Sequence, residues 1–278
     1  MQKGQLHEYY EHRAFASCEQ SYYFDESNMF WFLTHQARLN GIIGLFKSVS
    51  CKSRISTFLD AGCAEGLYLR LASSIFGEAC QNYGLDIARS HLIKSTSQHE
   101  PIWSLIQGDI EHLPFRSNTI DFVLCSEVLE HVSKWETALA ELARVSNAYL
   151  LISFPGETLA DLLLRIPSVR LKRKLNRDFR DKTHNSDLAH LHEVDGHISH
   201  PTINAVKSHL KKEGMVIQDE TYFQTIPPFI YAKLPFPENM RLRLYRLDHT
   251  AISTIMKRSL REFLSQRLIL ARKPNSKV

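Results

Sequence analysis

Short apolar runs alternate with segments of helical periodicity from residue 55 onward, and this alternation restricts the fold more than any other feature. The run at 120–125 is almost entirely apolar, as expected for a strand that is buried on both faces. Between such runs, apolar residues recur at intervals of three or four, for example at 135–145, which indicates helices. Strands that alternate with helices are typical of an α/β fold with a mainly parallel sheet. We predict strands at 55–59, 81–85, 103–107, 120–125, 149–154 and 267–271, a further strand that begins at 215–217, and a helix that begins at Pro201.

Three segments fall outside this alternation, at 1–54, 155–199 and 226–264. Nine aromatic side chains lie between positions 9 and 32, so the N-terminal segment should pack against protein and not extend into water. Insertions on an α/β sheet usually build the substrate site above the carboxyl ends of the strands. We therefore expect an N-terminal helical lid at 1–54 and a main domain at 55–278, in which the segments at 155–199 and 226–264 are substrate caps.

The composition is that of an ordinary soluble globular protein, with 44% hydrophobic and 23% charged residues. No apolar run reaches the roughly 20 residues needed to cross a bilayer. The five cysteines are odd in number and never spaced CxxC, which disfavours a disulfide framework and a zinc ribbon. We expect no bound metal and a cytoplasmic location, with peripheral attachment to a membrane left open.

The net charge of +4 is unevenly distributed. Residues 165–182 contain eight Lys or Arg against two acids, and residues 241–261 contain six against one. A basic surface of this kind suggests an anionic partner, such as a phosphorylated substrate, a nucleic acid or a membrane face. Two solvated helices would give the same charge pattern, so both interpretations stay open. Apolar residues at 229–236 precede the second basic window, which keeps the membrane surface among the alternatives.

A glycine-containing turn, with Gly62 and Gly66, joins the first predicted strand to the helix that follows it. Small residues at such a turn let the backbone bend sharply and let a ligand approach its peptide groups. Asp86 ends the next strand, where a carboxylate can accept hydrogen bonds from ribose hydroxyls. The glycine spacing is not that of GxGxxG, and Glu65 would place a negative charge beside a pyrophosphate. The pattern therefore favours a nucleoside with a neutral or positive group over a dinucleotide.

Four sequence blocks, at 57–66, 83–87, 107–115 and 122–132, resemble the class I S-adenosylmethionine-dependent methyltransferases in both order and spacing. The closest resemblance is to the branch that methylates small molecules in ubiquinone and menaquinone biosynthesis. It covers 55–154 and implies a seven-stranded, mainly parallel, Rossmann-like sheet with helices on both faces and an antiparallel last strand. Ala64 departs from the family pattern, because it replaces the middle glycine of DxGxGxG, and this puts the geometry of the loop in question.

The same resemblance implies S-adenosylmethionine as the cofactor and assigns residues to its parts. The loop at 60–66 would hold the methionine end, Asp86 the ribose hydroxyls, and residues 109–110 the adenine. Residues 126–127 would lie below the sulfonium. The cofactor-binding residues implied in this way are Asp60, Ala61, Gly62, Cys63, Gly66, Asp86, Ile87, Asp109, Ile110, Ser126 and Glu127.

Methyl transfer from a sulfonium is an in-line displacement that depends mainly on alignment and on the exclusion of water, so no triad or metal motif is required. If the acceptor must lose a proton, His131 is the first candidate base, because it follows the fourth strand by about six residues. A histidine bonded to the backbone at the start of a helix would give the same pattern. Glu127 is the second candidate, with cofactor contact as its alternative role.

The segment 190–200 is rich in histidine and acids, which are common metal ligands. It lacks the spacing of HExxH, and Gly196 predicts a turn, so we do not expect a metal there. His197 or His192 could instead contact a substrate, and a solvated loop is the alternative. Tyr22 and Tyr23 are candidates to close over the cofactor, with a place in the core as the alternative.

The sequence therefore predicts an S-adenosylmethionine-dependent methyltransferase that acts on a small-molecule acceptor of anionic or lipid-like character. Two alternatives stay open: an RNA or protein methyltransferase that uses the basic surface, and a catalytically silent partner protein that binds the cofactor. The fourth strand is not followed by an Asn/Asp-Pro-Pro-aromatic block, which disfavours methylation of nucleic-acid bases. We therefore expect no DNA partner.

Overall fold

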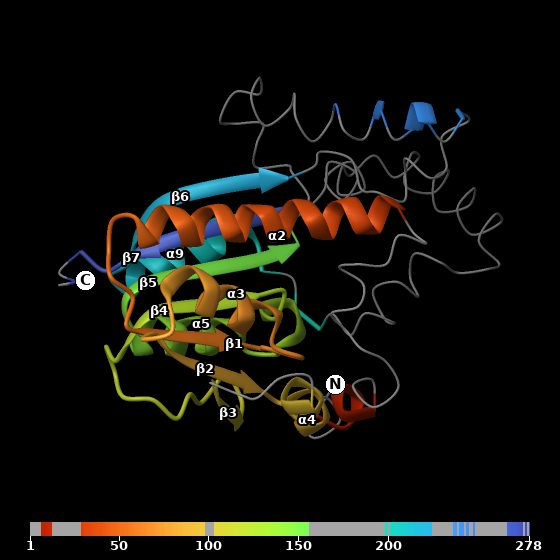
Figure 1. The fold of residues 1–278 in the computed structure, drawn as a ribbon. Helices are drawn as coiled ribbons and strands as arrows, with labels where there is room; N and C mark the ends of the chain where they lie inside the picture. The colour runs from red at the N-terminus through yellow and green to blue at the C-terminus, as the bar shows by residue number, and fades with distance from the viewer. Residues whose placement is uncertain are drawn as a thin grey trace, which may run out of the picture.

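The computed structural model describes residues 7–12, 29–97, 103–155, 198–199, 201–223, 236–237, 239–241, 243–244, 247, 266–274, 276 and 278. Its helices and strands are drawn in Figure 1. Residues 7–12 form a short N-terminal helix. The elements that follow are α2 (Met29–Ser50), β1 (Thr57–Ala61), α3 (Leu67–Phe76), β2 (Gln81–Asp86), α4 (Arg89–Ser97), β3 (Trp103–Gln107), β4 (Ile120–Ser126), the 3-10 helix η3 (Leu129–His131), α5 (Trp135–Val145), β5 (Ser146–Pro155), α9 (Ile203–Lys212), β6 (Val216–Phe223) and β7 (Gln266–Arg272).

The seven strands form one sheet in the order β3-β2-β1-β4-β5-β7-β6. Neighbouring strands from β3 to β5 are parallel, whereas β7 is antiparallel to both β5 and β6. This arrangement confirms the predicted seven-stranded, mainly parallel, Rossmann-like sheet with an antiparallel last strand. Because β1, β2, β3 and β4 run in the same direction, the residues that follow them meet along one edge of the sheet (Figure 1).

Several predicted boundaries differ from the structure. β1 is Thr57–Ala61 and not 55–59, and β5 begins at Ser146 and not at 149. β6 begins within the predicted start at 215–217 and extends to Phe223. The polar run at 218–220 conceals this strand in the sequence, since β6 has a neighbour on one side only and an edge strand tolerates polar side chains. α9 begins at Ile203 and not at Pro201, because the hydroxyl of Thr202 accepts a hydrogen bond from the backbone N–H of Ala205 and so caps the helix.

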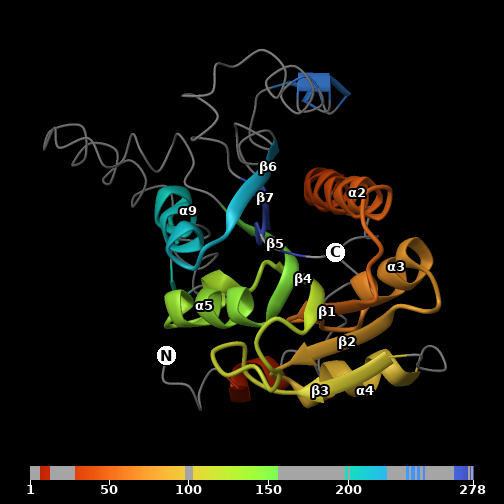
Figure 2. The same ribbon diagram turned by 90° about the vertical axis from the view of Figure 1, so that its left-hand side faces the viewer.

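Helices cover both faces of the sheet, as predicted (Figure 2). Side chains of α2, α3 and α4 enter the apolar cluster on one face, and those of α5 and α9 enter the cluster on the other. In the first cluster, the ring of Phe46 from α2 lies 5.5 Å from that of Phe58 in β1 and 5.1 Å from that of Phe122 in β4. The second half of α2 is therefore part of the core of the sheet, although it belongs to the segment 1–54 that we expected to act as a lid. The domain boundary at 54 stays a prediction.

Several predicted features lie outside the described residues. They include most of both cap segments, the basic window at 165–182 and the side chains of Tyr22, Tyr23, His192 and His197. Within the described ranges, no helix is long and apolar enough to cross a membrane.

Candidate active site

The loop between β1 and α3 makes a tight turn beside the end of β2. The backbone N–H groups of Gly62 and Cys63 both donate to the carbonyl oxygen of Leu85, at 2.7 and 3.0 Å. Gly62 has a φ of 88°, and a Cβ atom at this position would lie 2.3 Å from Cγ2 of Val128, which follows β4. Position 62 therefore requires glycine for two reasons: its backbone conformation and the close approach of the Val128 side chain.

Ala64, which replaces a glycine of the family pattern, keeps a backbone conformation that favours glycine. Its φ is 44°, in the left-handed region. This conformation costs an alanine about 1–2 kcal/mol. The cost is offset by a hydrogen bond, since the N–H of Ala64 donates to Oδ2 of Asp86 at 2.8 Å. The substitution at 64 therefore leaves a turned loop that is bonded to the end of β2.

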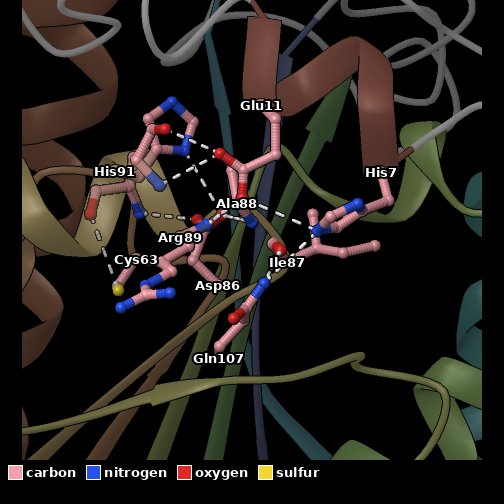
Figure 3. Close-up of polar contacts among 11 residues, drawn as sticks. His7, Glu11, Cys63, Asp86, Ile87, Ala88, Arg89, His91 and Gln107 are labelled. Atoms are coloured by element: carbon pink, nitrogen blue, oxygen red, sulfur yellow. Dashed lines mark hydrogen bonds and ion pairs between the residues drawn. The ribbon is translucent and has the colours of Figure 1, made fainter.

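The carboxylate of Asp86 connects the loop, the end of β2 and the start of α4 (Figure 3). One oxygen accepts the bond from Ala64, and the other, Oδ1, accepts a hydrogen bond from the backbone N–H of Ala88 at 2.9 Å. Nδ1 of His91 lies 3.2 Å from the same Oδ1 atom. Asp86 is therefore held firmly at the end of β2, the position that the family resemblance gives to the ribose hydroxyls.

Asp60, in β1, is a fully buried carboxyl group. Its exposed fraction is 0%, and in the part of the chain that the structure describes neither of its oxygens has a hydrogen-bond partner. Burial raises the pKa of Asp60 well above its usual range, and the nearby Asp86 raises it further. A buried polar group without a partner costs free energy, so it calls for a functional explanation. A cationic ligand group such as an ammonium would complete its interactions, and the residues present therefore suit S-adenosylmethionine.

Asp60→Asn is expected to stabilise the protein and to weaken cofactor binding. The folded protein keeps a proton on Asp60 above the ordinary pKa, so the wild type loses stability as pH rises from that value toward the raised pKa. The amide does not titrate. The free energy of unfolding of Asp60→Asn should therefore exceed that of the wild type by near zero at about pH 4 and by about 1–3 kcal/mol at about pH 8. Urea unfolding across this range measures the difference.

Asp121→Asn is the matched control for this substitution. Oδ2 of Asp121 accepts a hydrogen bond from the backbone N–H of Ser56, and Oδ1 accepts one from the side chain of Asn147, both at 2.9 Å. This variant should lose stability, because an amide cannot accept both bonds. If Asp60→Asn loses stability at pH 8 as Asp121→Asn does, Asp60 is not an unpaired group.

Asp109 and Ile110, the predicted adenine residues, follow β3 and lie beside the end of β2. The backbone N–H of Gly108 donates to the carbonyl oxygen of Asp86 at 2.9 Å, which ties the two strand ends together. Oδ1 of Asp109 accepts a hydrogen bond from the N–H of Glu111 at 2.9 Å, and Ile110 is 5% exposed. The fold thus brings the predicted ribose and adenine residues to the same edge of the sheet.

Asp109, Glu111 and His112 place ligand-type atoms within 4.8 Å of one another, close enough to share a metal ion. However, the His112 side chain is 72% exposed, and one oxygen of Asp109 already accepts a backbone hydrogen bond. Exposed acidic groups of this kind are common without an ion. The cluster therefore supports no metal centre by itself. The histidine-rich segment at 190–197 lies outside the described residues, and the expectation of no metal stays a prediction.

The residue that follows β4 is paired with a buried arginine. Nη1 of Arg38, in α2, lies 2.9 Å from Oε2 of Glu127, and the Arg38 side chain is only 5% exposed. The hydroxyl of Ser153 donates to the other oxygen, Oε1, at 2.8 Å. Oγ of Ser126 lies 3.0 Å from Oγ of Ser153, which extends the network. Because both oxygens of Glu127 are engaged, its geometry favours a positioning role over that of a base.

Two more titratable groups flank this ion pair, and burial shifts the pKa of each toward the uncharged form. Glu130 is 2% exposed; burial raises its pKa well above the usual range, and Glu127 raises it further. Burial lowers the pKa of His35 to about 3, with a further contribution from Arg38. Nδ1 of His35 lies 2.9 Å from Nη2 of Arg38. Burial therefore disfavours the charged forms of Glu130 and His35 beside the ion pair of Arg38 and Glu127.

His131, the first candidate base, ends the 3-10 helix η3 directly after β4. Its Nε2 atom lies 4.0 Å from Oε1 of Glu130, and its ring packs edge-to-face on Tyr10 with centroids 5.6 Å apart. The side chain is 18% exposed. His197 lies outside the described residues, but the two residues after it, 198 and 199, donate backbone hydrogen bonds to the carbonyl oxygen of Glu130 at 2.9 and 3.0 Å. The chain that returns from the first cap segment is therefore anchored beside η3.

The helix at 7–12 contacts the same edge of the sheet (Figure 3). The Glu11 carboxylate accepts hydrogen bonds from the backbone N–H of Arg89 at 2.5 Å and from the hydroxyl and N–H of Ser90 at 2.6 and 3.2 Å. Nε2 of His7 lies 3.3 Å from Nε2 of Gln107, the last residue of β3. With the ring contact described above, this helix touches residues that follow β2, β3 and β4.

Three residues of this site carry no sequence motif. Glu11 and Arg38 precede the four family blocks, and Ser153 lies after them. For two of them a weak signal exists, since each interrupts an apolar context: Arg38 lies between buried Ala37 and Leu39, and Ser153 lies within the apolar run at 149–154. A charged or polar residue at a buried position must be paired, and that requirement is the only sequence-level indication of their role.

Residues 59–150 match the protein family described as "Methyltransferase domain". A curated relative is demethylmenaquinone methyltransferase of Bacillus licheniformis, which is 33% identical over 93 residues, 32% of this chain and 40% of that protein. Another is the biotin biosynthesis bifunctional protein BioHC of Cellvibrio japonicus, 31% identical over 108 residues, 37% of this chain and 21% of that protein. The chain thus spans less than half the length of these curated relatives.

Solved structures share the fold at low sequence identity. Magnesium protoporphyrin IX methyltransferase from Synechocystis PCC 6803 with bound SAH has a TM-score of 0.62 at 16% identity, covering 98% of this chain and 99% of that one. The [4+2]-cyclase SpnF has a TM-score of 0.52 at 15% identity, covering 87% and 82%. The family match and the strand order identify the segment at 59–150 as a class I S-adenosylmethionine-dependent methyltransferase domain.

Proposed function

We propose that this protein is a methyltransferase that binds S-adenosylmethionine and transfers its methyl group by in-line displacement to a small-molecule or lipid-like acceptor. The observation that carries the proposal is Asp60, a fully buried carboxyl group without a hydrogen-bond partner among the described residues, at the start of a glycine turn. Methyltransferase relatives, among them the demethylmenaquinone enzyme, support the reaction class. The fold also occurs in a [4+2]-cyclase, so the reaction must be tested on the site itself.

In this proposal the loop at 60–66 holds the methionine end of the cofactor, with Asp60 as the counter-charge for its cationic part. The carboxylate of Asp86 and the backbone of Ile87 receive the ribose, and residues 109–110 bind the adenine. When bound, S-adenosylmethionine supplies an electrophilic methyl group on a positively charged sulfur. The apolar residues of β1 and β4 around this edge exclude water, which favours a reaction in which charge disappears.

His131 is the residue that we propose to accept a proton from an acceptor hydroxyl or amine. An imidazole can do so near neutral pH without further activation. His131 ends η3, which follows β4, and its side chain is 18% exposed, so an acceptor at the end of β4 could reach the imidazole. Glu127, held by Arg38 and Ser153, positions the end of β4.

Isothermal titration with S-adenosylmethionine and with NAD tests the cofactor. We expect micromolar binding of the first and none of the second; absence of heat with S-adenosylmethionine, or binding of NAD, would refute the proposal. Transfer of a labelled methyl group is then followed separately into small molecules, RNA and protein in a cell extract. Label in the small-molecule fraction supports the proposal, and label in RNA or protein supports the alternative acceptors. Cofactor binding without transfer to any fraction supports the silent partner.

His131→Asn should lower kcat and leave the Kd for the cofactor unchanged.

We also propose that the helix at 7–12 closes over the bound cofactor, as a part of the predicted N-terminal lid. Its contacts span the ends of the strands that would bind ribose, adenine and methyl group. Burial raises the pKa of Glu11, but the hydrogen bonds from Ser90 and from the backbone of Arg89 outweigh it, so the pKa is lowered overall. A lowered carboxyl pKa stabilises docking above the ordinary value, and this contribution is lost as pH falls through the lowered pKa.

Glu11→Ala is expected to raise the dissociation rate of the cofactor product by about tenfold, because the helix loses its bonds to the start of α4. Stopped-flow displacement measures this rate. His12→Ala is the control, since His12 is exposed on the same helix and should leave the rate unchanged. Equal rates in the wild type and in Glu11→Ala would show that the helix does not cover the cofactor.

A further inference from the structure

The segment at 236–247 exposes large apolar side chains. Phe236 is 44% exposed, Met240 46%, Leu244 36% and Leu247 59%. The backbone N–H of Arg241 donates to the carbonyl oxygen of Pro237 at 3.0 Å, so a helical turn begins at Pro237. At 3.6 residues per turn, positions 240, 244 and 247 share one face of a helix. The described side chains of Met240, Leu244 and Leu247 therefore form an exposed apolar stripe.

Basic residues accompany this stripe. Arg243 is exposed, and on a helix it lies about 60° from the centre of the apolar face. The sequence window 241–261 holds six Lys or Arg against one acid. A monomeric soluble protein rarely exposes grouped large apolar side chains, and a combination with cationic flanks matches the chemistry of an anionic lipid surface. Apolar side chains then enter the acyl boundary while the basic groups meet the lipid phosphates.

The position of the segment suits this role. Figure 1 shows the helical pieces of 239–247 beyond the end of β6, on the side toward which β2, β5 and β6 point. That side also carries the residues that follow β1, β2 and β4. Among the described residues, no helix could span a membrane, so the contact would be peripheral.

We propose that the segment at 236–247 docks the protein on the surface of an anionic lipid bilayer. Its apolar face inserts shallowly, and the adjoining arginines bind headgroup phosphates. The inference does not depend on methyl transfer, since vesicle binding can be measured without cofactor or acceptor. If the proposed function also holds, the site would open toward the membrane surface, where a lipid-like acceptor resides.

Flotation with vesicles of phosphatidylcholine and phosphatidylglycerol tests the proposal with the full chain. We expect the wild type to float with anionic vesicles and to remain behind with phosphatidylcholine alone. Raising the ionic strength from about 0.1 M to about 1 M, which shortens the Debye length from about 10 Å to about 3 Å, should release much of the bound protein. Leu244→Glu combined with Leu247→Glu should lower the ratio of bound to free protein by about tenfold or more. Arg243→Glu should weaken anionic-vesicle binding at low salt only.

Ile93→Glu is the matched control. Ile93 lies on α4 and is 56% exposed, but it is far in sequence from the stripe and has no cationic window after it. This variant should bind vesicles as the wild type does, and thermal unfolding should show that all variants are folded. Absence of vesicle binding by the wild type would overturn the proposal. So would equal binding by the double Leu variant, or a dimer in size-exclusion chromatography that the double variant alone dissociates, because the stripe would then be a contact between copies.

Discussion

Gly62→Ala is expected to lower the affinity for S-adenosylmethionine by about 100-fold or more, and the free energy of unfolding by about 2–4 kcal/mol. The backbone at 62 has a φ of 88°, and the new Cβ would lie 2.3 Å from Cγ2 of Val128. The loop must therefore move away from β4, which strains its bonds to Leu85 and displaces the peptide groups that face the cofactor. Isothermal titration and urea unfolding measure the two effects.

Gly77→Ala separates the cost of the backbone from that of the clash. Gly77 has a φ of 90°, almost that of Gly62, but a Cβ there would meet nothing within 4 Å. With a ψ of 166°, Gly77 lies in a region that is essentially restricted to glycine, so this control should lose about 1–3 kcal/mol and keep cofactor affinity within about twofold. Adding Val128→Ala to Gly62→Ala should recover part of the loss, since the clashing atom is removed. Equal loss of affinity in both glycine variants would contradict the steric argument.

Arg38→Met is expected to reduce the free energy of unfolding by about 1–3 kcal/mol, because it leaves Glu127, which is 22% exposed, without its cation. The loss should depend on pH. Glu130 has a raised pKa, so the folded state loses stability as pH rises from the ordinary value toward the raised one. Arg38 opposes this rise, and its removal raises the pKa of Glu130 further. The destabilisation should therefore be larger at about pH 8 than at about pH 5, as measured by urea unfolding.

Lys207→Met is the control for this ion pair. Lys207 pairs with Glu220 at 2.5 Å, but the Lys207 side chain is 22% exposed, whereas that of Arg38 is 5% exposed. The control pair also lies away from the site, between α9 and β6. We expect a loss of at most about 1 kcal/mol and no effect on cofactor affinity. A loss as small as this in Arg38→Met would mean that solvent compensates Glu127 and that α2 does not hold the end of β4.

Much of the sheet could be predicted from the sequence, because buried parallel strands are nearly continuous apolar runs and most of them are separated by periodic helices. Only the start of β6 can be predicted, because an edge position permits polar side chains that interrupt the pattern further along the strand. The start of α9 was also misplaced, since Pro201 and Thr202 both signal a helix start and only the side-chain bond of Thr202 decides between them.

The cofactor residues could be predicted for a similar reason: the acids that end parallel strands must meet at one edge. The structure brings Asp60, Asp86 and Asp109 together there, although their roles toward a ligand stay predictions. The partners of these residues could not be predicted. Arg38 and Glu11 come from segments that precede the motif region. The contact between Glu11 and Ser90 joins residues that are far apart in the sequence, and no sequence pattern indicates it.

Helix α2 contributes to two parts of the molecule. The ring of Phe46 packs in the apolar core, and the guanidinium of Arg38 pairs with Glu127 after β4. A chain trimmed to the region that matches the family, 59–150, would therefore lack the core residues that α2 supplies and the arginine that pairs with Glu127. The family match at 59–150 therefore leaves out the helix that holds the residue after β4 in place.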